Sequence, residues 1–289
     1  MATPTAERIY DDGLVAPYAP NLYHYDHIAT DGLNGFDAID DQAIARFDQQ
    51  GYLVVNNAFT LEEVRGGLDG LLRLISGEVA DFNGVIYERA ATGLPVEDMT
   101  AEQRQDYVRK FMWFEQYDDR LHRMAHHLKL LAAVECIIGD TPFLFQDMAL
   151  LKPPHIGREK PWHQDHAYFQ LALNTRVVGC WIALDEATTE NGCMIVIPGT
   201  HRQGPVVHFQ RRDWQICDTD VKNQGATAVP LKPGSCLLFS SLIHHGTPTN
   251  NSGLRRRAVQ FHYRPASAPK TTVEERLAIF GEEDKDVTC

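Results

Sequence analysis

Apolar residues recur at helical spacing in the first half of the chain. A helix is predicted from Leu61 to about Ser76, because apolar side chains there return every three or four positions and would pack one face on a sheet. These side chains are Val64, Leu68, Leu71, Leu72 and Ile75. Thr60 and Glu63 have the spacing of a capping box that would begin this helix. The other elements predicted in this half are a short helix over 43–50, a strand over 51–55 and a helical region over 118–139.

Short apolar or alternating runs, separated by turns, fill the chain from Phe143 onward. They cover residues 143–151, 162–171, 177–184, 194–197, 236–239 and 258–264. Pro-Pro, Asn-Gly and Pro-Gly pairs break the chain between them. Strands at this spacing are typical of a sandwich or barrel, so we expect a mainly β fold with flanking helices: a double-stranded β-helix, or jelly roll, with its core at about 143–265. The whole chain, 1–289, would form one domain with an irregular arm over residues 1–38.

The composition is that of an ordinary globular protein with an acidic surplus. Charged residues make up 23% and apolar residues 44% of the chain, and the formal net charge is -12. A general polyanion binder would be basic, so nucleic acid is not an expected partner. The net charge argues less strongly against one phosphorylated small molecule, because residues 211–212 and 255–257 form local basic clusters.

The sequence predicts a soluble, cytoplasmic protein with no membrane partner. No apolar run approaches the roughly 18 residues of a membrane span, and the first twelve residues lack the basic and apolar segments of a leader peptide. The six cysteines include no C-x-x-C pair, and several lie in apolar runs, where a reduced thiol serves as a small core residue. We therefore expect free thiols in a reducing compartment.

His163 and Asp165 carry the most informative chemistry of the chain. They lie two positions apart after a Pro-Trp step, and on a strand this spacing would place both side chains on one face. A further imidazole is available from His244 or His245 in a later apolar run. Two imidazoles and one carboxylate form the facial set that holds non-haem Fe(II) and leaves positions open for oxygen chemistry. We expect the jelly roll to bring the two segments together across its two sheets.

A second group of histidines lies in the predicted helical region. His122, His126 and His127 recur at helical intervals, and such a group can be mistaken for a metal site. The sequence fixes no carboxylate partner for them. Partly exposed helix histidines without a bound metal are therefore the favoured interpretation.

Several short motifs follow one another in a characteristic order. They are LLKPP at 150–154, WHQDHAYF at 162–169, Trp181, NGCM at 191–194, PGTH at 198–201, HGT at 245–247, and Arg256. Single motifs of this kind are weak, since H-x-D arises by chance in many proteins. In this order and spacing, which cover most of the chain, they resemble the phytanoyl-CoA dioxygenase family of iron(II)- and 2-oxoglutarate-dependent oxygenases.

The resemblance implies three iron ligands, His163, Asp165 and His245, with 2-oxoglutarate and O₂ as co-substrates. One carboxylate and two neutral imidazoles leave three positions on an octahedral ferrous ion, two for a bidentate 2-oxo acid and one for O₂. The family places its distal histidine eleven positions before an arginine that binds the co-substrate. This spacing selects His245 with Arg256 and makes His244 an outward or flanking residue.

Arg256 is expected to be the main anchor of 2-oxoglutarate, because a planar guanidinium can donate two parallel hydrogen bonds to the distal carboxylate. Thr247 shares the face of His245 and matches a small hydroxyl residue that helps to hold this carboxylate in the family. Arg255 and Arg257 alternate away from Arg256. The resemblance also implies co-substrate contacts for Lys110, Met148, Gln164 and Trp181, and it makes the PGTH turn structural.

The carboxylate of Asp165 favours hydroxylation over halogenation. Halogenases built on this site carry a small residue in that position, so that chloride can bind iron. We therefore expect oxidation of an unactivated C–H bond in a small organic substrate, with release of succinate and CO₂. Desaturation, epoxidation and ring formation stay open, and the substrate could be an acyl-CoA or another metabolite.

Two other functions remain as alternatives. A cupin-like isomerase or lyase would use the metal as a Lewis acid, which explains the three ligands but leaves Arg256 and Thr247 without a role. A catalytically silent binding module would use the metal only to hold a ligand or to stabilise the domain, and the intact ligand set argues against it.

Overall fold

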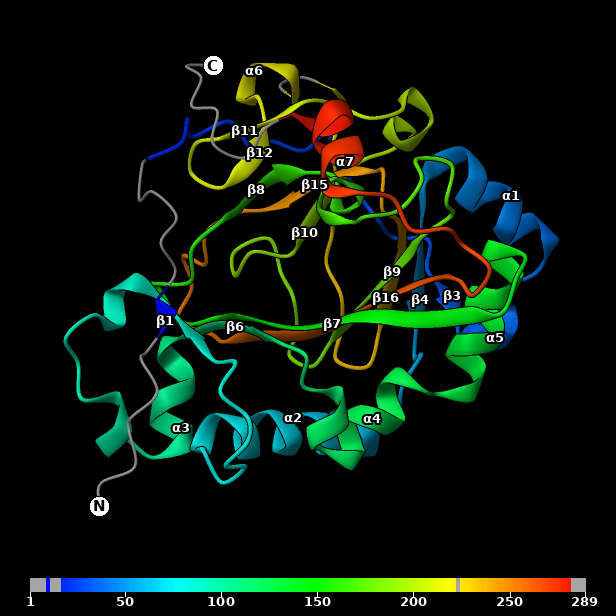
Figure 1. Cartoon of the computed structure of the whole chain (residues 1–289). Coiled ribbons are helices and arrows are strands. Elements are labelled where there is room, and N and C mark those ends of the chain that lie inside the picture. Colours follow the sequence, from blue (N-terminus) through cyan, green and yellow to red (C-terminus); the bar gives the residue numbers. More distant parts are fainter. Residues whose placement is uncertain (1–8, 11–16, 222–223, 282–289) are drawn as a thin grey trace.

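Two β-sheets lie face to face, and helices cover the outer side of the larger sheet (Figure 1). The structure is a computed structural model and describes residues 9–10, 17–221 and 224–281. The larger sheet has the strand order β1-β5-β6-β7-β16-β9-β14-β4-β3, and the smaller one has the order β2-β13-β10-β15-β8. Strands β11 and β12 pair with each other beside the smaller sheet. This arrangement is a jelly roll, as the strand spacing predicts.

The strands are β1 (Ile9–Tyr10), β2 (His27–Ile28), β3 (Leu33–Asn34), β4 (Tyr52–Asn56), β5 (Ile86–Tyr87), β6 (Val108–Met112), β7 (Pro142–Lys152), β8 (Lys160–His163), β9 (Val178–Ala183), β10 (Met194–Ile197), β11 (His208–Gln210), β12 (Trp214–Ile216), β13 (Thr227–Val229), β14 (Cys236–Ser240), β15 (His244–Thr247) and β16 (Arg256–Pro265). The α-helices are α1 (Asp41–Gln50), α2 (Leu61–Ser76), α3 (Ala101–Arg104), α4 (Asp119–Ala125), α5 (Leu128–Ile138), α6 (Asp218–Val221) and α7 (Val273–Phe280). The 3₁₀ helices are η1 (Phe36–Ala38), η2 (Arg89–Ala91), η3 (Val96–Asp98), η4 (Gln105–Tyr107), η5 (Glu115–Tyr117), η6 (Asp165–Tyr168) and η7 (Thr200–Gln203).

Helix α2 begins as its capping box predicts. The Thr60 amide donates to Glu63 Oε2 at 2.7 Å, and the Glu63 amide donates to Thr60 Oγ1 at 3.2 Å. The helical region predicted over 118–139 is in fact two helices, α4 and α5. The chain leaves helical geometry at His126 and His127, and His127 then caps α5 by accepting from the amide of Leu130.

Strand residues alternate between two hydrophobic cores. Cys180 and Ile182 of β9 pack toward the helices, whereas Trp181 and Ala183 pack between the two sheets. Strand β16 alternates in the same way, with Val259, Phe261 and Tyr263 in the helix-side core and Ala258 between the sheets. Its polar residues Arg256, Gln260 and His262 share the face of Ala258, so they are buried inside the jelly roll.

The described part of the N-terminal arm packs against β8. Trp162 donates its indole N–H to the carbonyl of Leu22 at 3.2 Å, and the ring of Tyr23 stacks on Trp162 with 5.8 Å between centroids. Strand β2 of this arm pairs in parallel with β13 of the smaller sheet, and strand β3 pairs in parallel with β4 of the larger sheet. Residues 1–8 and 11–16 of the predicted arm lie outside the described residues.

Two further expectations can be compared with the described residues. Within residues 9–10, 17–221 and 224–281, no helix has the length and apolar character needed to cross a membrane. Cys136, Cys180, Cys193, Cys217 and Cys236 are free thiols, and all but Cys136 are buried. The sixth cysteine lies in the C-terminal segment outside the described residues.

Candidate active site

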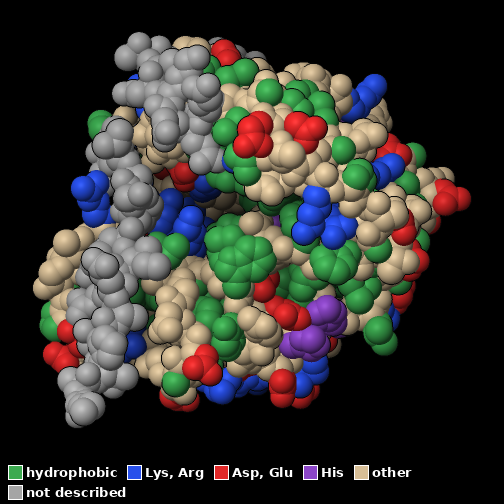
Figure 2. Space-filling view, viewed as in Figure 1, with side chains coloured by type: hydrophobic (Ala, Val, Ile, Leu, Met, Phe, Trp, Pro, Cys, Tyr) green, Lys and Arg blue, Asp and Glu red, His purple; other side chains and the backbone are tan. Residues whose placement is uncertain are grey.

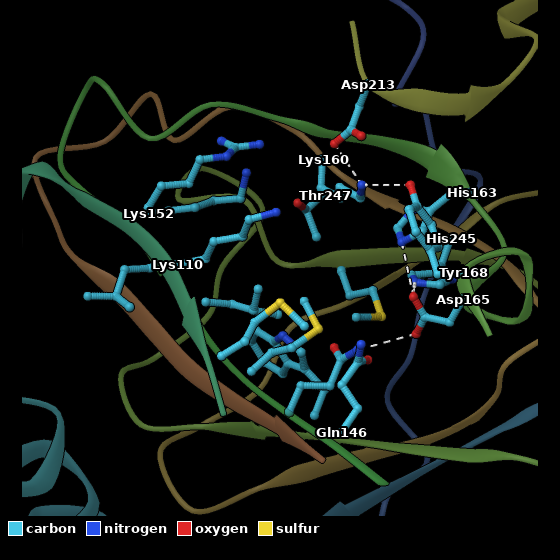
Figure 3. A pocket seen from close by; sticks show the side chains of 18 of the residues that line it. Lys110, Gln146, Lys152, Lys160, His163, Asp165, Tyr168, Asp213, His245 and Thr247 are labelled. Atoms are coloured by element: carbon cyan, nitrogen blue, oxygen red, sulfur yellow. Dashed lines mark hydrogen bonds and ion pairs between the residues drawn. The ribbon is translucent and has the colours of Figure 1, made fainter. Parts of the chain in front are cut away.

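Three side chains that could bind a metal ion meet at one end of the smaller sheet. His163 ends β8, His245 lies on the neighbouring antiparallel strand β15, and the two residues are direct cross-strand partners. Asp165 follows in η6. Its Oδ1 atom lies 3.2 Å from His163 Nε2 and 3.6 Å from His245 Nε2 (Figure 3). The three ligand atoms all lie within 4.8 Å of one another, and all three residues are buried.

Two expectations about this geometry are wrong. The run 162–171 is not one strand, because β8 ends at His163 and the chain then turns into a 3₁₀ helix. This turn, and not the two-residue period of a strand, brings Asp165 back toward His163. The histidines also do not meet across the two sheets, because β8 and β15 are neighbours within one sheet.

Backbone carbonyls fix which nitrogen of each histidine faces the centre. His163 Nδ1 lies 2.8 Å from the carbonyl oxygen of Pro161, and His245 Nδ1 lies 3.0 Å from that of Ile243. A carbonyl only accepts, so each Nδ1 carries the proton and each Nε2 presents a lone pair. Burial, reinforced by His163, lowers the pKa of His245 to about 3. The site therefore offers a neutral imidazole donor at His245.

The carboxylate of Asp165 is held from its other side by β16. His262 Nε2 lies 2.8 Å from Asp165 Oδ2, and the Gln260 amide donates to the same oxygen at 3.3 Å. Burial by itself would raise the pKa of Asp165, but the nearby imidazoles of His245 and His262 and the hydrogen bond from His262 outweigh it, so the pKa lies well below its usual range. Asp165 is thus an ionised, oriented ligand group with Oδ1 directed at the histidines.

Replacing His262 with alanine is expected to weaken metal binding at this site by roughly 10- to 100-fold, because the imidazole orients the Asp165 carboxylate. Metal affinity of the purified variant would be measured by competition with a chelator. His262→Gln, whose amide can still donate, should recover part of the loss. An alanine variant that stays folded and keeps the full affinity would contradict this role.

A cavity of about 170 Å³ opens beside the three side chains. Besides His163, Asp165 and His245, its walls include five further residues that the sequence selects: Lys110, Met148, Trp181, Thr247 and Arg256. Lys110 and Met148 come from the paired strands β6 and β7, and Thr247 follows His245 on β15. Figure 3 shows Thr247 and the lysines around the same space as the histidines.

Arg256 is a buried cation, and two of its three guanidinium nitrogens lack a hydrogen-bond partner among the described residues. The residue is 3% exposed, and its Nε and Nη1 atoms have no hydrogen-bond partner among the residues that the structure describes. Its guanidinium carbon lies 5.3 Å from the ring centre of Trp181, and burial lowers the pKa of Arg256 to about 10. Leaving such a charge unpaired is costly, so this end of the cavity suits an anion.

The two neighbouring arginines, in contrast, are paired outside the cavity. Arg257 contacts Asp185 at 2.7 Å, and Arg255 contacts Asp106 at 2.6 Å. This follows from the alternation of side chains along β16. Among the three, Arg256 alone lines the cavity.

Further polar groups on the cavity wall received no role from the sequence. Lys152 is buried, and burial followed by repulsion from Arg256 and Arg109 lowers its pKa well below the usual value. Lys160 donates to Asp213 Oδ2 at 2.6 Å and to the Tyr168 hydroxyl at 3.0 Å. Lysines and arginines outnumber the carboxylates of Asp165 and Asp213 on the wall, so the cavity favours a small, strongly anionic ligand.

Gln164 does not line this cavity, contrary to the expected co-substrate contact. It is fully buried, and its amide donates to the carbonyls of Gly204 at 2.9 Å and Leu242 at 2.7 Å. Its side-chain oxygen accepts from the amide of Val206 at 2.8 Å. Gln164 therefore ties the segment after β8 to the loops near residues 204–206 and 242.

His244 lies beside the site without joining it. It is buried on the opposite face of β15 from His245, and burial lowers the pKa of His244 to about 4. Its backbone amide donates to Thr200 Oγ1 at 2.9 Å. His201, in the same PGTH turn as Thr200, has Nε2 3.1 Å from the carbonyl oxygen of Asp48. The turn thus contacts helix α1 through His201 and β15 through Thr200.

Comparisons with known proteins agree with this site. The family described as "Phytanoyl-CoA dioxygenase (PhyH)" matches residues 47–258. The peroxisomal phytanoyl-CoA dioxygenase of Bos taurus is 28% identical over 240 residues, which cover 79% of this chain and 69% of that protein. The structure of EvdO2 from Micromonospora carbonacea var. aurantiaca, complexed with 2-oxoglutarate, is 25% identical with a TM-score of 0.64, covering 81% of this chain and 94% of that chain.

A third comparison concerns the fold alone. The non-heme alpha ketoglutarate dependent carbocyclase SnoK from nogalamycin biosynthesis has a TM-score of 0.66 at 19% identity, covering 89% of this chain and 97% of that chain. Both structural neighbours thus share the jelly roll over most of their length. Since the family match spans most of the sequence as well, the chain belongs to the phytanoyl-CoA dioxygenase family and is a non-haem dioxygenase that depends on iron(II), 2-oxoglutarate and O₂.

Proposed function

We propose that this protein hydroxylates, or otherwise oxidises, an unactivated C–H bond of a small organic substrate. In the hydroxylation, one oxygen atom of O₂ enters the substrate and the other enters succinate, as 2-oxoglutarate loses CO₂. The observation that carries the proposal is the buried guanidinium of Arg256, which lines the same cavity as His163, Asp165 and His245. A distal carboxylate of 2-oxoglutarate would give this cation its missing partner.

The residues divide into metal ligands and co-substrate contacts. We assign His163, Asp165 and His245 to iron, and Arg256 with Thr247 to the distal carboxylate. Lys110, Met148 and Trp181 line the same cavity and are assigned to the walls around the co-substrate. When bound, the ferrous ion would activate O₂, which is the oxidant, and 2-oxoglutarate would supply two of the electrons that reduce it. The chain holds the donor atoms in place and shields them from solvent.

A larger cavity of about 720 Å³ adjoins the first and is the proposed substrate entrance. The two cavities share the wall residues Gln146, Tyr168 and Phe169. Trp113 and Phe143, which also line the outer cavity, are 57% and 48% exposed. Hydrophobic side chains gather over β6 and β7 in the middle of this face (Figure 2). Exposed aromatic walls suit the apolar part of a substrate, so we propose a substrate with a substantial apolar portion.

The proposal is tested by succinate release from 2-oxoglutarate. Protein stripped with EDTA is expected to release none, and Fe(II) with O₂ should restore release whereas Zn²⁺ should not. A deproteinised extract of source cells should increase the release, with the stimulating compound in the fraction retained on a reversed-phase column. No succinate from iron-loaded protein with or without extract would overturn the oxygenase, and Zn²⁺-supported conversion of an extract component without succinate would favour the isomerase or lyase.

A further inference from the structure

His122 on helix α4 and His126, the C-cap residue of this helix, lie about one turn apart beside a carboxylate. The rings of His122 and His126 stack with 4.4 Å between their centroids. Glu115 Oε1 lies 2.6 Å from His122 Nδ1 and 2.7 Å from His126 Nε2. The sequence left these histidines without a carboxylate partner, and η5 supplies one. All three ligand atoms lie within 4.8 Å of one another.

The backbones that carry these side chains are held in place. The Asp147 carboxylate accepts from the amides of Phe114 at 3.0 Å and Glu115 at 3.1 Å, which fixes the start of η5. Helix α4 is anchored from its other side, because Leu121, Met124 and Ala125 are buried in the helix-side core. A ligand that gathers the three side chains therefore needs only side-chain rotation, and little ordering of the main chain opposes it.

The cluster is accessible from solvent. The side chains of His122 and His126 are 53% and 41% exposed, and that of Glu115 is 18% exposed. Figure 2 shows histidine side chains gathered over α4 with acidic side chains next to them. A hydrated ion can therefore reach the donor atoms without any opening of the fold.

We propose that Glu115, His122 and His126 form a second metal site, separate from the iron centre, for a divalent transition metal such as Zn²⁺. Two imidazoles and one carboxylate are a common three-residue zinc ligand set, with water in the fourth position. Tetrahedral bonds of about 2.0–2.2 Å separate donor atoms by roughly 3.3 Å. The observed separations of 2.6 and 2.7 Å thus need to widen by well under ~1 Å.

Binding at this site exchanges protons for the ion without any redox change. Each imidazole would bind as a neutral ring that carries its proton on the nitrogen away from the metal, and the carboxylate would bind ionised. Glu115 also lines the outer cavity, so the ion would add positive charge at the rim of that cavity. The proposal does not depend on the oxygenase reaction, since none of its three ligands lies in the inner cavity.

The test is a Zn²⁺ titration of the metal-free, full-length protein against a chromophoric chelator. The wild-type chain is expected to bind two equivalents, one at each site. His126→Ala and Glu115→Gln should each still bind one equivalent of Zn²⁺ at the iron site. Their affinity for the second equivalent should fall by more than roughly 10- to 100-fold, which is the loss typical of removing a residue that only supports a metal ligand. Asp165→Ala should retain the equivalent on α4.

The control is His24→Ala, because His24 is also an exposed histidine near a carboxylate, 3.6 Å from Asp26. This variant should keep both equivalents, and the melting temperature of each variant reports whether it is folded. The proposal is overturned if folded Asp165→Ala binds no zinc, or if His126→Ala binds zinc as the wild type does. The result of the zinc titration can be interpreted even if the protein releases no succinate. The second metal site and the oxygenase reaction are therefore tested separately.

Discussion

Replacing Asp165 with alanine is expected to abolish iron binding and to lower succinate release by at least about 1,000-fold. The change removes the charged ligand and leaves two neutral imidazoles, which hold a ferrous ion poorly. It also strands the donors of His262 and Gln260, which point at Asp165 Oδ2. Iron content per chain after anaerobic reconstitution and the succinate assay measure the two effects.

Asp213→Asn is the matched control for this variant. Asp213 lines the same cavity but pairs with Lys160 at 2.6 Å, away from the three proposed ligands. The asparagine variant should therefore keep its iron. Full iron content and full succinate release in a folded Asp165→Ala protein would remove Asp165 from the ligand set.

Arg256→Ala is expected to raise the concentration of 2-oxoglutarate that the enzyme requires by about two to three and a half orders of magnitude. Stranding the distal carboxylate in a buried site costs on the order of 3 to 5 kcal/mol, which corresponds to a change of this size. Arg256→Lys should recover little, because an ammonium cannot reproduce the two parallel hydrogen bonds. The KM for 2-oxoglutarate measures the effect, and iron content should not change.

Arg255→Ala provides the comparison, because Arg255 directly precedes Arg256 and the start of β16. Arg255 is adjacent in sequence but pairs with Asp106 and Glu102 outside the cavity. Its removal should leave the KM for 2-oxoglutarate as it is. An unchanged KM in Arg256→Ala would disprove the anchor assignment and return the isomerase alternative to consideration.

Local sequence patterns predicted the parts of the fold whose causes are local. The capping box at Thr60 and Glu63 set the start of α2, and short apolar or alternating runs identified β9, β10 and β16. Strand β6 and the β11–β12 pair were missed. Their polar or charged positions break the apolar pattern, and they are strands because of the neighbours with which they pair.

The candidate site shows the same division between local and non-local causes. Arg256 was identified through the family resemblance, whose eleven-residue spacing pairs it with His245, whereas the supporting residues Gln260 and His262 were not identified. Their role depends on β16 reaching Asp165, which no spacing within either segment specifies. A usable signal was present, because both lie on the face of β16 that carries Arg256. Gln164 lies outside the cavity wall, because the turn after β8 directs its side chain to the carbonyls of Gly204 and Leu242, which its closeness in sequence to His163 and Asp165 does not predict.

If Arg256 anchors 2-oxoglutarate as proposed, its partly unpaired guanidinium also links the lifetime of the protein in the cell to its metabolism. With 2-oxoglutarate absent, a buried guanidinium whose Nε and Nη1 atoms lack partners among the described residues lowers the free energy of unfolding. A ligand that binds only the folded chain restores stability, by about 2.7 kcal/mol at one hundred times its Kd. Since proteases remove the unfolded fraction, cells rich in 2-oxoglutarate would retain more of this enzyme than starved cells at equal rates of synthesis.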